Sequence, residues 1–300
     1  MIKQPLIVNR YDNIEEVYKA SLSFLEKHPE LMDSINNNIL VLHELLDLIP
    51  QNIENVCSGH YFPYAGAYDE ISNSYQLCLY GFYRYSFIAL RSVLELGILG
   101  VYFAVDDKEH INVVPWMTSE MGTPRLKIIL NKLNDIEYYK LFNNNYNLTG
   151  RIINVYGKLS NYVHIGGYKY SSMAQARSNI NVFSEKALNK YYLLAKEVAS
   201  LIVLTVLTKY PIGLQSLPLT EKFGLNGPAG GLLEGHQVTT IKGVLAEKEI
   251  LFLKKLSDED PSVQTTISYI ESLPDMTDEE WDKQVKAFDK HMEEMKKGND

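Results

Sequence analysis

The sequence predicts an all-α protein built as a helical bundle. Within residues 31–49, apolar residues recur at alternating spacings of four and three, the pattern of an amphipathic helix: Ile35, Ile39, Leu42, Leu46 and Ile49. Residues 70–105 are apolar nearly throughout, which is typical of a buried helix. The first 210 residues show no alternating strand pattern, so we expect no sheet beyond at most a small hairpin near residues 236–242.

Each expected helix has its own signal of period or capping. In chain order the helices are expected at 13–27, 31–49, 70–105, 123–142, 148–165 and 181–209, with a loop at 50–68. Thr123-Pro124 is typical of a helix start with proline in the first turn. Gly166-Gly167 is expected to end the helix before it, because glycine takes the left-handed conformation readily.

The composition changes after residue 210. Residues 211–235 contain nine Gly or Pro residues in 25, which indicates a linker or extended arm where proteolysis should concentrate. We therefore divide the chain into N-terminal helices (1–69), a central helical domain (70–210), a Gly/Pro-rich linker (211–240) and a small acidic helical unit (241–300).

The last helix of the acidic unit is expected to begin with a capping box, Thr277-Asp-Glu-Glu280. It carries an apolar stripe among charged residues: Trp281, Val285, Phe288 and Met292. The stripe either packs on the main domain, which we favour because such residues rarely stay exposed, or binds a partner.

Charge and cysteine content exclude several classes of protein. The net charge is −8, of which −6 falls in residues 240–300, so a broad surface that coats nucleic acid is not expected, although a local basic pocket is compatible. Two cysteines are too few for a disulfide framework, and we expect neither a metal nor a cofactor. The N-terminus lacks the pattern of a signal peptide and charges interrupt the longest apolar stretches, so we expect a cytoplasmic protein without a membrane partner.

Two clusters of polar residues are candidates for a site. Arg84, Arg91 and Glu95 lie within about 40° of one another on an otherwise apolar helix, so they either form an internal salt bridge or line a polar pocket. The second cluster is the segment 156–167, in which Ser160 can reach the ring of His164 one turn later. His164 is either a structural group near the helix end or a catalytic acid–base.

The string Tyr156-x-x-Leu159-Ser160-x-Tyr162-Val163-His164, together with Arg91-x-x-x-Glu95, resembles bacterial HEPN-like helical proteins over roughly residues 70–210. Many of these proteins occur in toxin, abortive-infection and antiviral systems. Active members are metal-independent ribonucleases marked by an arginine and a histidine with four to six residues between them, and two protomers often face each other. The resemblance thus implies an RNA substrate, a homodimer and an antidote or defence-system protein as partners.

At the arginine position of that motif this chain has Lys158. Lysine keeps the positive charge but lacks the planar guanidinium that binds a phosphate through two hydrogen bonds. Two functions follow. In the first, the chain is a metal-independent endoribonuclease in which His164 exchanges a proton, Lys158 or Arg91 stabilises the phosphorane, and Ser160 and Glu95 orient the others. In the second, the chain is an inactive HEPN-like scaffold that binds a protein or a small ligand.

Overall fold

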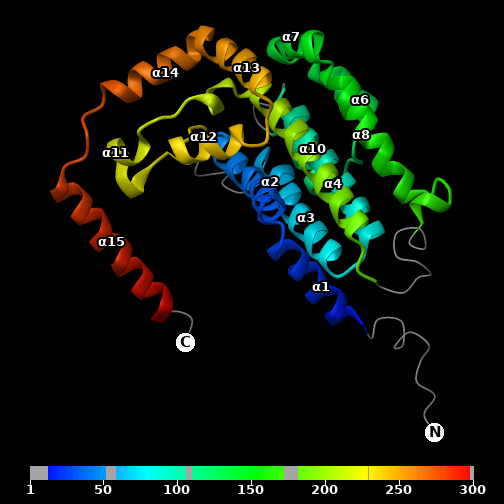
Figure 1. Cartoon of the computed structure of the whole chain (residues 1–300). Helices are drawn as coiled ribbons and strands as arrows, with labels where there is room; N and C mark the ends of the chain where they lie inside the picture. Colours follow the sequence, from blue (N-terminus) through cyan, green and yellow to red (C-terminus); the bar gives the residue numbers. More distant parts are fainter. Residues whose placement is uncertain (1–12, 52–58, 106–109, 172–181, 229, 298–300) are drawn as a thin grey trace.

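The computed structural model describes residues 13–51, 59–105, 110–171, 182–228 and 230–297, and all regular structure within them is helical, as predicted (Figure 1). In chain order the elements are α1 (Ile14–Glu26), α2 (Pro29–Leu48), α3 (Tyr61–Leu79), α4 (Tyr83–Ala104), α5 (Val113–Met117), α6 (Leu126–Leu133), α7 (Glu137–Tyr146), α8 (Leu148–Val163), η2 (Tyr168–Tyr170), α10 (Glu185–Lys209), η3 (Pro211–Leu214), α11 (Leu219–Phe223), η4 (Gly224–Asn226), α12 (Gly235–Lys242), α13 (Glu247–Glu259), α14 (Pro261–Ser272) and α15 (Asp278–Lys297).

Helices α4 and α10 lie at the centre of the bundle, between α2, α3 and α8. The two central helices approach closely because α4 carries glycine at the crossing: a Cβ on Gly97 would lie 2.6 Å from Ile202. By length and composition alone both helices could cross a membrane, but 67% and 83% of their most apolar windows are buried inside the fold. Their apolar faces form the core of the bundle, as in a soluble protein.

The expectation of one helix over residues 70–105 is wrong, because Gly81 divides it into α3 and α4. Gly81 has a φ of +78°, a conformation that glycine adopts without steric cost. The amide of Phe82 donates to the carbonyl of Leu77 at 2.8 Å, the hydrogen bond of a Schellman closure. The predicted loop over 50–68 also ends earlier than expected, since α3 begins at Tyr61; residues 52–58 lie outside the described residues.

Two other boundaries differ from the prediction. The helix expected over 123–142 is two helices, α6 and α7, separated where Ile136 takes an extended conformation with ψ of 117°. The hairpin expected near 236–242 is the helix α12, whose Glu234–Gln237 capping box satisfies its first amides. Val238 and Ile241 lie three residues apart and are both buried, so packing against the bundle determines the helical conformation.

The Gly/Pro-rich segment is packed against the protein. Its buried leucines are Leu214, Leu217, Leu219 and Leu233. The amide of Gly231 donates to the carbonyl of Asp47 at 2.7 Å, which ties the segment to the end of α2. One hydrophobic core extends from Phe24 to Leu253 and therefore runs across the predicted boundaries at residues 69 and 240.

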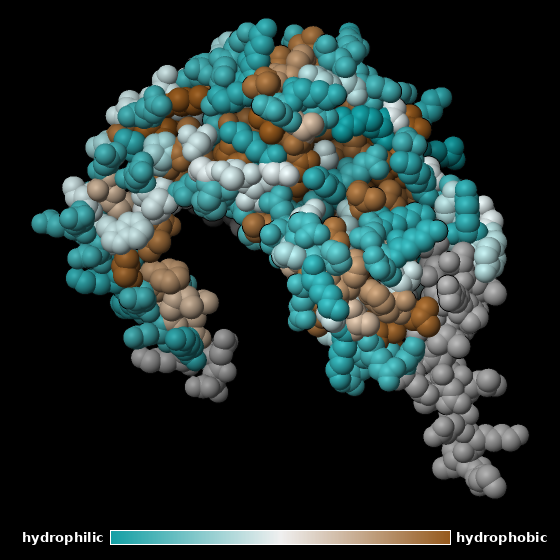
Figure 2. Space-filling model, viewed as in Figure 1, coloured by the Kyte–Doolittle hydropathy of each residue, from teal (hydrophilic) through white to brown (hydrophobic). Residues whose placement is uncertain are grey.

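Hydrogen bonds and an ion pair attach α12 and α13 to the bundle. The Gln237 side chain donates to Glu44 and Asp47 on α2, both at 2.7 Å, and Arg151 on α8 pairs with the buried Glu249 at 2.7 Å. Beyond α13, helices α14 and α15 continue the chain into an arc that ends away from the bundle (Figure 1). Figure 2 shows the resulting hollow between α15 and the N-terminal helices.

The predicted capping box of α15 is confirmed: the Thr277 hydroxyl accepts from the Glu280 amide, and the Glu280 carboxylate accepts from the Thr277 amide at 2.9 Å. The expectation that the apolar stripe packs on the main domain is wrong, because α15 contacts mainly η4 and its stripe residues Trp281, Phe288 and Met292 are exposed.

Candidate functional site

The predicted charged stripe of α4 faces α8 and forms a polar seam within the apolar bundle. The Arg91 guanidinium donates to Glu95 at 3.1 Å and to the Tyr156 hydroxyl at 2.6 Å, and it lies 4.6 Å from the centre of the Tyr156 ring. Only 19% of the Arg91 side chain is exposed. Arg91 and Glu95 are thus brought together as predicted, with Tyr156 as a third member.

Arg84, two turns earlier on α4, reaches the end of α8. Its guanidinium donates to the carbonyl of Val163 at 3.1 Å and lies 5.5 Å from the centre of the Tyr85 ring. The carbonyl is one of the last of α8, which has no partner within the helix, so Arg84 satisfies it and complements the negative end of the helix. Arg84 therefore lies beside the residue that follows Val163, which is His164.

His164 is the C-cap of α8, and its side chain is exposed. The helix closes with Ile165, not with glycine as predicted: Ile165 has a φ of +47°, and the amide of Gly166 donates to the Asn161 carbonyl at 2.9 Å. A β-branched residue in this conformation is strained, at a cost of about 1–2 kcal/mol. The closure directs the chain away from α8 and leaves the His164 ring at the surface.

The other predicted site residues lie closer to the middle of α8. Lys158 pairs with Glu197 of α10 at 3.7 Å, and the Ser160 hydroxyl is buried without a hydrogen-bond partner among the described residues. No hydrogen bond or ion pair in the described part of the chain joins His164 to Arg91 or Glu95. Tyr156, which holds Arg91, lies about 12 Å along the helix from His164.

A basic and aromatic surface surrounds the end of α8, which we call the α8 end: Arg84, His164, Tyr168, Lys169, Tyr170 and Lys190. The Lys190 ammonium lies 5.2 Å from the centre of the Tyr162 ring, and Tyr162 in turn packs at 5.1 Å against Tyr170. Burial lowers the pKa of Lys190; the nearby Tyr170 opposes this shift, and the charge of Lys169 adds to it. Tyr168 is 70% exposed. Stacking rings among cations are the features that bind single-stranded nucleic acid.

Sequence reasoning missed Lys169 and Lys190 as members of this surface. Lys169 follows Gly166-Gly167 directly, and that closeness to His164 was a usable signal. Lys190 gave no signal, because only the packing of α10 beside α8 brings it to the same end of the bundle.

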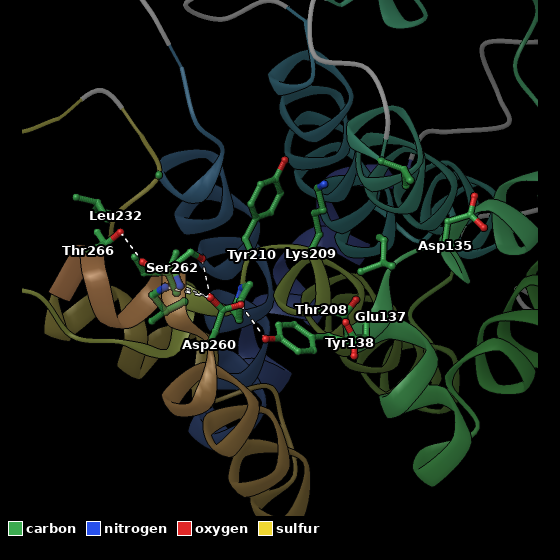
Figure 3. Close-up of a pocket in the computed structure, with 16 residues that line it drawn as sticks. Asp135, Glu137, Tyr138, Thr208, Lys209, Tyr210, Leu232, Asp260, Ser262 and Thr266 are labelled. Atoms are coloured by element: carbon green, nitrogen blue, oxygen red, sulfur yellow. Dashed lines mark hydrogen bonds between the residues drawn. The ribbon is translucent and has the colours of Figure 1, made fainter. Parts of the chain in front are cut away.

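A cavity of about 580 Å³ lies at the opposite end of the bundle, where the start of α7, the end of α10 and the start of α14 meet (Figure 3). Asp260 lines this cavity and accepts hydrogen bonds from the Tyr138 hydroxyl at 2.8 Å and from the Ser262 amide at 2.8 Å. Lys209 and Tyr210 extend away from Asp260 (Figure 3). Lys209 and Lys190 are 19 residues apart on α10, about 28 Å along the axis, so this cavity is separate from the α8 end.

Groups that could hold a metal ion are absent from the part of the chain that the structure describes. Comparison with protein-family models, with curated proteins and with solved structures found no match to this chain. The candidate site therefore rests on its own chemistry: an exposed imidazole, a guanidinium bound to the carbonyl of the preceding residue, and two ammonium groups among aromatic rings.

Proposed function

We propose that this chain is a HEPN-like protein that cleaves single-stranded RNA without a metal ion, with His164 as acid–base and Arg84 as the group that binds phosphate. The observation that carries the proposal is the hydrogen bond between Arg84 and Val163, which fixes a guanidinium at the end of α8, at the residue before the exposed His164. This pair supplies the arginine and histidine of the ribonuclease motif from two helices, whereas Lys158 is engaged with Glu197.

The reaction would be a transphosphorylation within the RNA strand. The ribose 2′-oxygen attacks the adjacent phosphorus as its proton leaves, and the bond from phosphorus to the 5′-oxygen of the next nucleotide breaks. The products are a 2′,3′-cyclic phosphate and a 5′-hydroxyl. His164 exchanges a proton with the attacking or leaving oxygen and water exchanges the other proton, so that the proton lost by the 2′-oxygen is balanced by the one gained by the 5′-oxygen. Arg84 stabilises the charge that develops on the phosphorane.

Substrate binding is supported by the rest of the α8 end. Tyr168 and Tyr85 are exposed rings on which unpaired bases can stack, and Lys169 and Lys190 can neutralise neighbouring phosphates. Over the whole chain, acidic residues outnumber basic residues, and negative charge repels the RNA backbone. We therefore expect RNA to bind only at this end of the bundle. Arg91 and Glu95 are positioning residues here, because each is bound to the other and Arg91 also to Tyr156.

The test is cleavage of a labelled single-stranded RNA in the presence of a chelator, with identification of the cyclic phosphate. We expect His164→Ala to lower the rate by a factor of about 10²–10⁴. The matched control is His236→Ala, since His236 is also an exposed histidine but lies on α12. Cleavage by His164→Ala at the wild-type rate would overturn the assignment.

A second function, the inactive HEPN-like scaffold, is favoured by one observation: the two other cations that the motif could use, Lys158 and Arg91, are both paired with carboxylates. This reading expects binding without cleavage. Wild-type protein that binds RNA or a protein partner, cleaves no RNA and does not slow growth when produced alone would favour the scaffold. Toxicity that depends on His164 and is relieved by an antidote protein would favour the nuclease of a cytoplasmic toxin or defence system.

A further inference from the structure

The exposed stripe of α15 has the spacing of a coiled-coil seam. Its five apolar residues follow one another at intervals of four, three, four and three: Trp281, Val285, Phe288, Met292 and Met295. At 100° per residue they fall within about 80° of arc, narrower than the face that a helix of a globular core usually presents. All but Val285 are exposed, and Phe288 is 53% exposed. This pattern predicts pairing with another helix.

A groove of about 650 Å³ lies beside the stripe, between α15 and the α11–η4 segment. Its apolar lining is formed by Phe223, Leu225, Met276, Ala287 and Phe288. The Gln284 side chain fixes α15 along this flank, because it donates to the Phe223 carbonyl at 3.1 Å and accepts from the Leu225 amide at 2.7 Å. The helix is therefore held on one side, and apolar side chains along it face the hollow of the molecule (Figure 2).

We propose that α15 pairs in antiparallel orientation with the α15 of a second copy of this chain, so that the two stripes cover each other. The spacing argues for a helix with the same seam, which a second copy supplies. The charges argue for the orientation. Asp282 and Lys296 are two heptads apart and so lie on the same flank of the stripe, near opposite ends of the helix.

Antiparallel pairing brings Asp282 of each copy close to Lys296 of the other, two attractive contacts against the one repulsive contact between the two copies of Asp289 at the middle of the same flank. Parallel pairing would instead set two copies of the acidic first turn side by side, and like charges there repel: Asp278, Glu279, Glu280 and Asp282. In the antiparallel pair the positive N-terminal end of each helix dipole also lies beside the negative C-terminal end of the other, which is favourable.

The size of the contact predicts a dimer that depends on concentration. A helix of 20 residues is about 30 Å long, and two such seams bury on the order of 1,000 Å², near the lower limit for a specific interface. Part of the second helix can also enter the groove beside Phe288. The pairing involves neither the α8 end nor His164. The experiments that test the dimer therefore do not depend on whether the chain cleaves RNA.

The first experiment measures the mass of the full chain by light scattering over a wide range of concentration. We expect the mass to rise from 34.3 kDa towards twice that value, and Phe288→Asp to stay monomeric with an unchanged melting temperature of the bundle. The matched control is Leu193→Asp, because Leu193 is exposed on α10 and distant in sequence from the stripe. A wild-type chain that is monomeric throughout, or a dimer that survives Phe288→Asp, would overturn the proposal.

The second experiment tests the orientation with a short thiol cross-linker. Phe288→Cys lies near the middle of the stripe, so its thiols approach each other in an antiparallel pair and cross-link. Trp281→Cys lies at one end, where the same pair separates the two thiols by roughly 20 Å along the axis. The wild-type chain controls for its native cysteines. Efficient cross-linking through Trp281→Cys would show a parallel pair and refute the antiparallel one.

Discussion

The guanidinium of Arg84 donates a 3.1 Å hydrogen bond to the carbonyl of Val163, the last residue of α8, and so joins two helices at a point one residue before His164. Arg91 lies seven residues later on the same face of α4, yet it is bound to Tyr156 and Glu95 in the middle of the seam. The two arginines therefore have separable roles, one at the exposed end of α8 and one in the packing of α4 on α8.

We expect Arg91→Gln and Arg84→Gln to differ in their effects. Arg91→Gln leaves the partly buried Glu95 without its cation and should lower the free energy of unfolding by about 1–3 kcal/mol, with little change in RNA affinity. Arg84→Gln should weaken RNA binding and cleavage. Urea denaturation and fluorescence anisotropy with a labelled RNA measure the two effects. Equal loss of RNA affinity in both variants would contradict the separation.

We expect His164→Ala to change the free energy of unfolding by less than about 0.5 kcal/mol, because the His164 side chain is exposed and its backbone amide keeps its bond to the Ser160 carbonyl. A structural histidine buried among its partners would cost more, about 1–3 kcal/mol. Thermal and urea denaturation of the variant therefore distinguish the two roles before any assay of activity. A loss above about 1 kcal/mol would assign His164 to the fold.

Local signals in the sequence were sufficient for the fold class and for some ends of helices. The period of Ile35 to Ile49 and the Thr277–Glu280 box are each contained in a single element, and both are present in the structure. Gly81 was missed because the residues around it are apolar without interruption, although the glycine itself was the signal. At 238–241, where the sequence left room for a small hairpin, the packing of Val238 and Ile241 on the bundle favours a helix.

The candidate site was only partly predictable for a similar reason. The Arg91–Glu95 pair lies within one helix and follows from its spacing. The bond between Arg84 and Val163 spans 79 residues, and the pair of Lys158 with Glu197 joins α8 to α10. Such contacts depend on which helices are neighbours, and a single sequence does not contain that information.

Replacement of Ile165 by glycine should stabilise the protein. Ile165 has a φ of +47° and is 52% exposed, so little burial is lost when its side chain is removed. Relief of about 1–2 kcal/mol of strain exceeds the added entropy of glycine in the unfolded chain, and we expect a net gain of about 0.5–1 kcal/mol. Ile165→Ala is the control, because alanine retains a Cβ and much of the strain. Denaturant unfolding measures both, and a less stable glycine variant would contradict the strain.

Ionisation of Asp260 should make part of the free energy of unfolding depend on pH. Burial opposes its ionisation, but hydrogen bonds from Ser262, Tyr138 and the amide of Val263 outweigh this and lower the pKa of Asp260 below its ordinary value. A depressed folded pKa means that the stabilisation is fully present above the unfolded pKa of about 4 and is lost as the pH falls through the lower folded value.

The test compares the wild type with Asp260→Asn, which keeps an N-cap for α14 but cannot ionise. We expect the wild type to be more stable above about pH 5 by less than about 1 kcal/mol, and the difference to shrink as the pH falls below 4. Urea denaturation at a series of pH values measures the difference. A difference that is constant with pH would exclude Asp260 as the titrating group.

Limited proteolysis should first cut the connection between α14 and α15, and not the Gly/Pro-rich segment 211–235. Glycine and proline indicated a flexible linker, but Leu214, Leu217 and Leu233 are buried there, and a protease must unfold a segment locally before it can cleave it.

The connection at 273–277 has no regular structure, and the Lys222 ammonium holds it at the Leu273 carbonyl and the exposed Asp275. Surface ion pairs of this kind contribute less than about 1 kcal/mol, so local opening there is easier. Digestion with a protease of broad specificity, followed by mass spectrometry, should therefore release α15 and leave a core that extends through α14. First cuts within 211–235 would show that this segment opens more readily than its burial predicts.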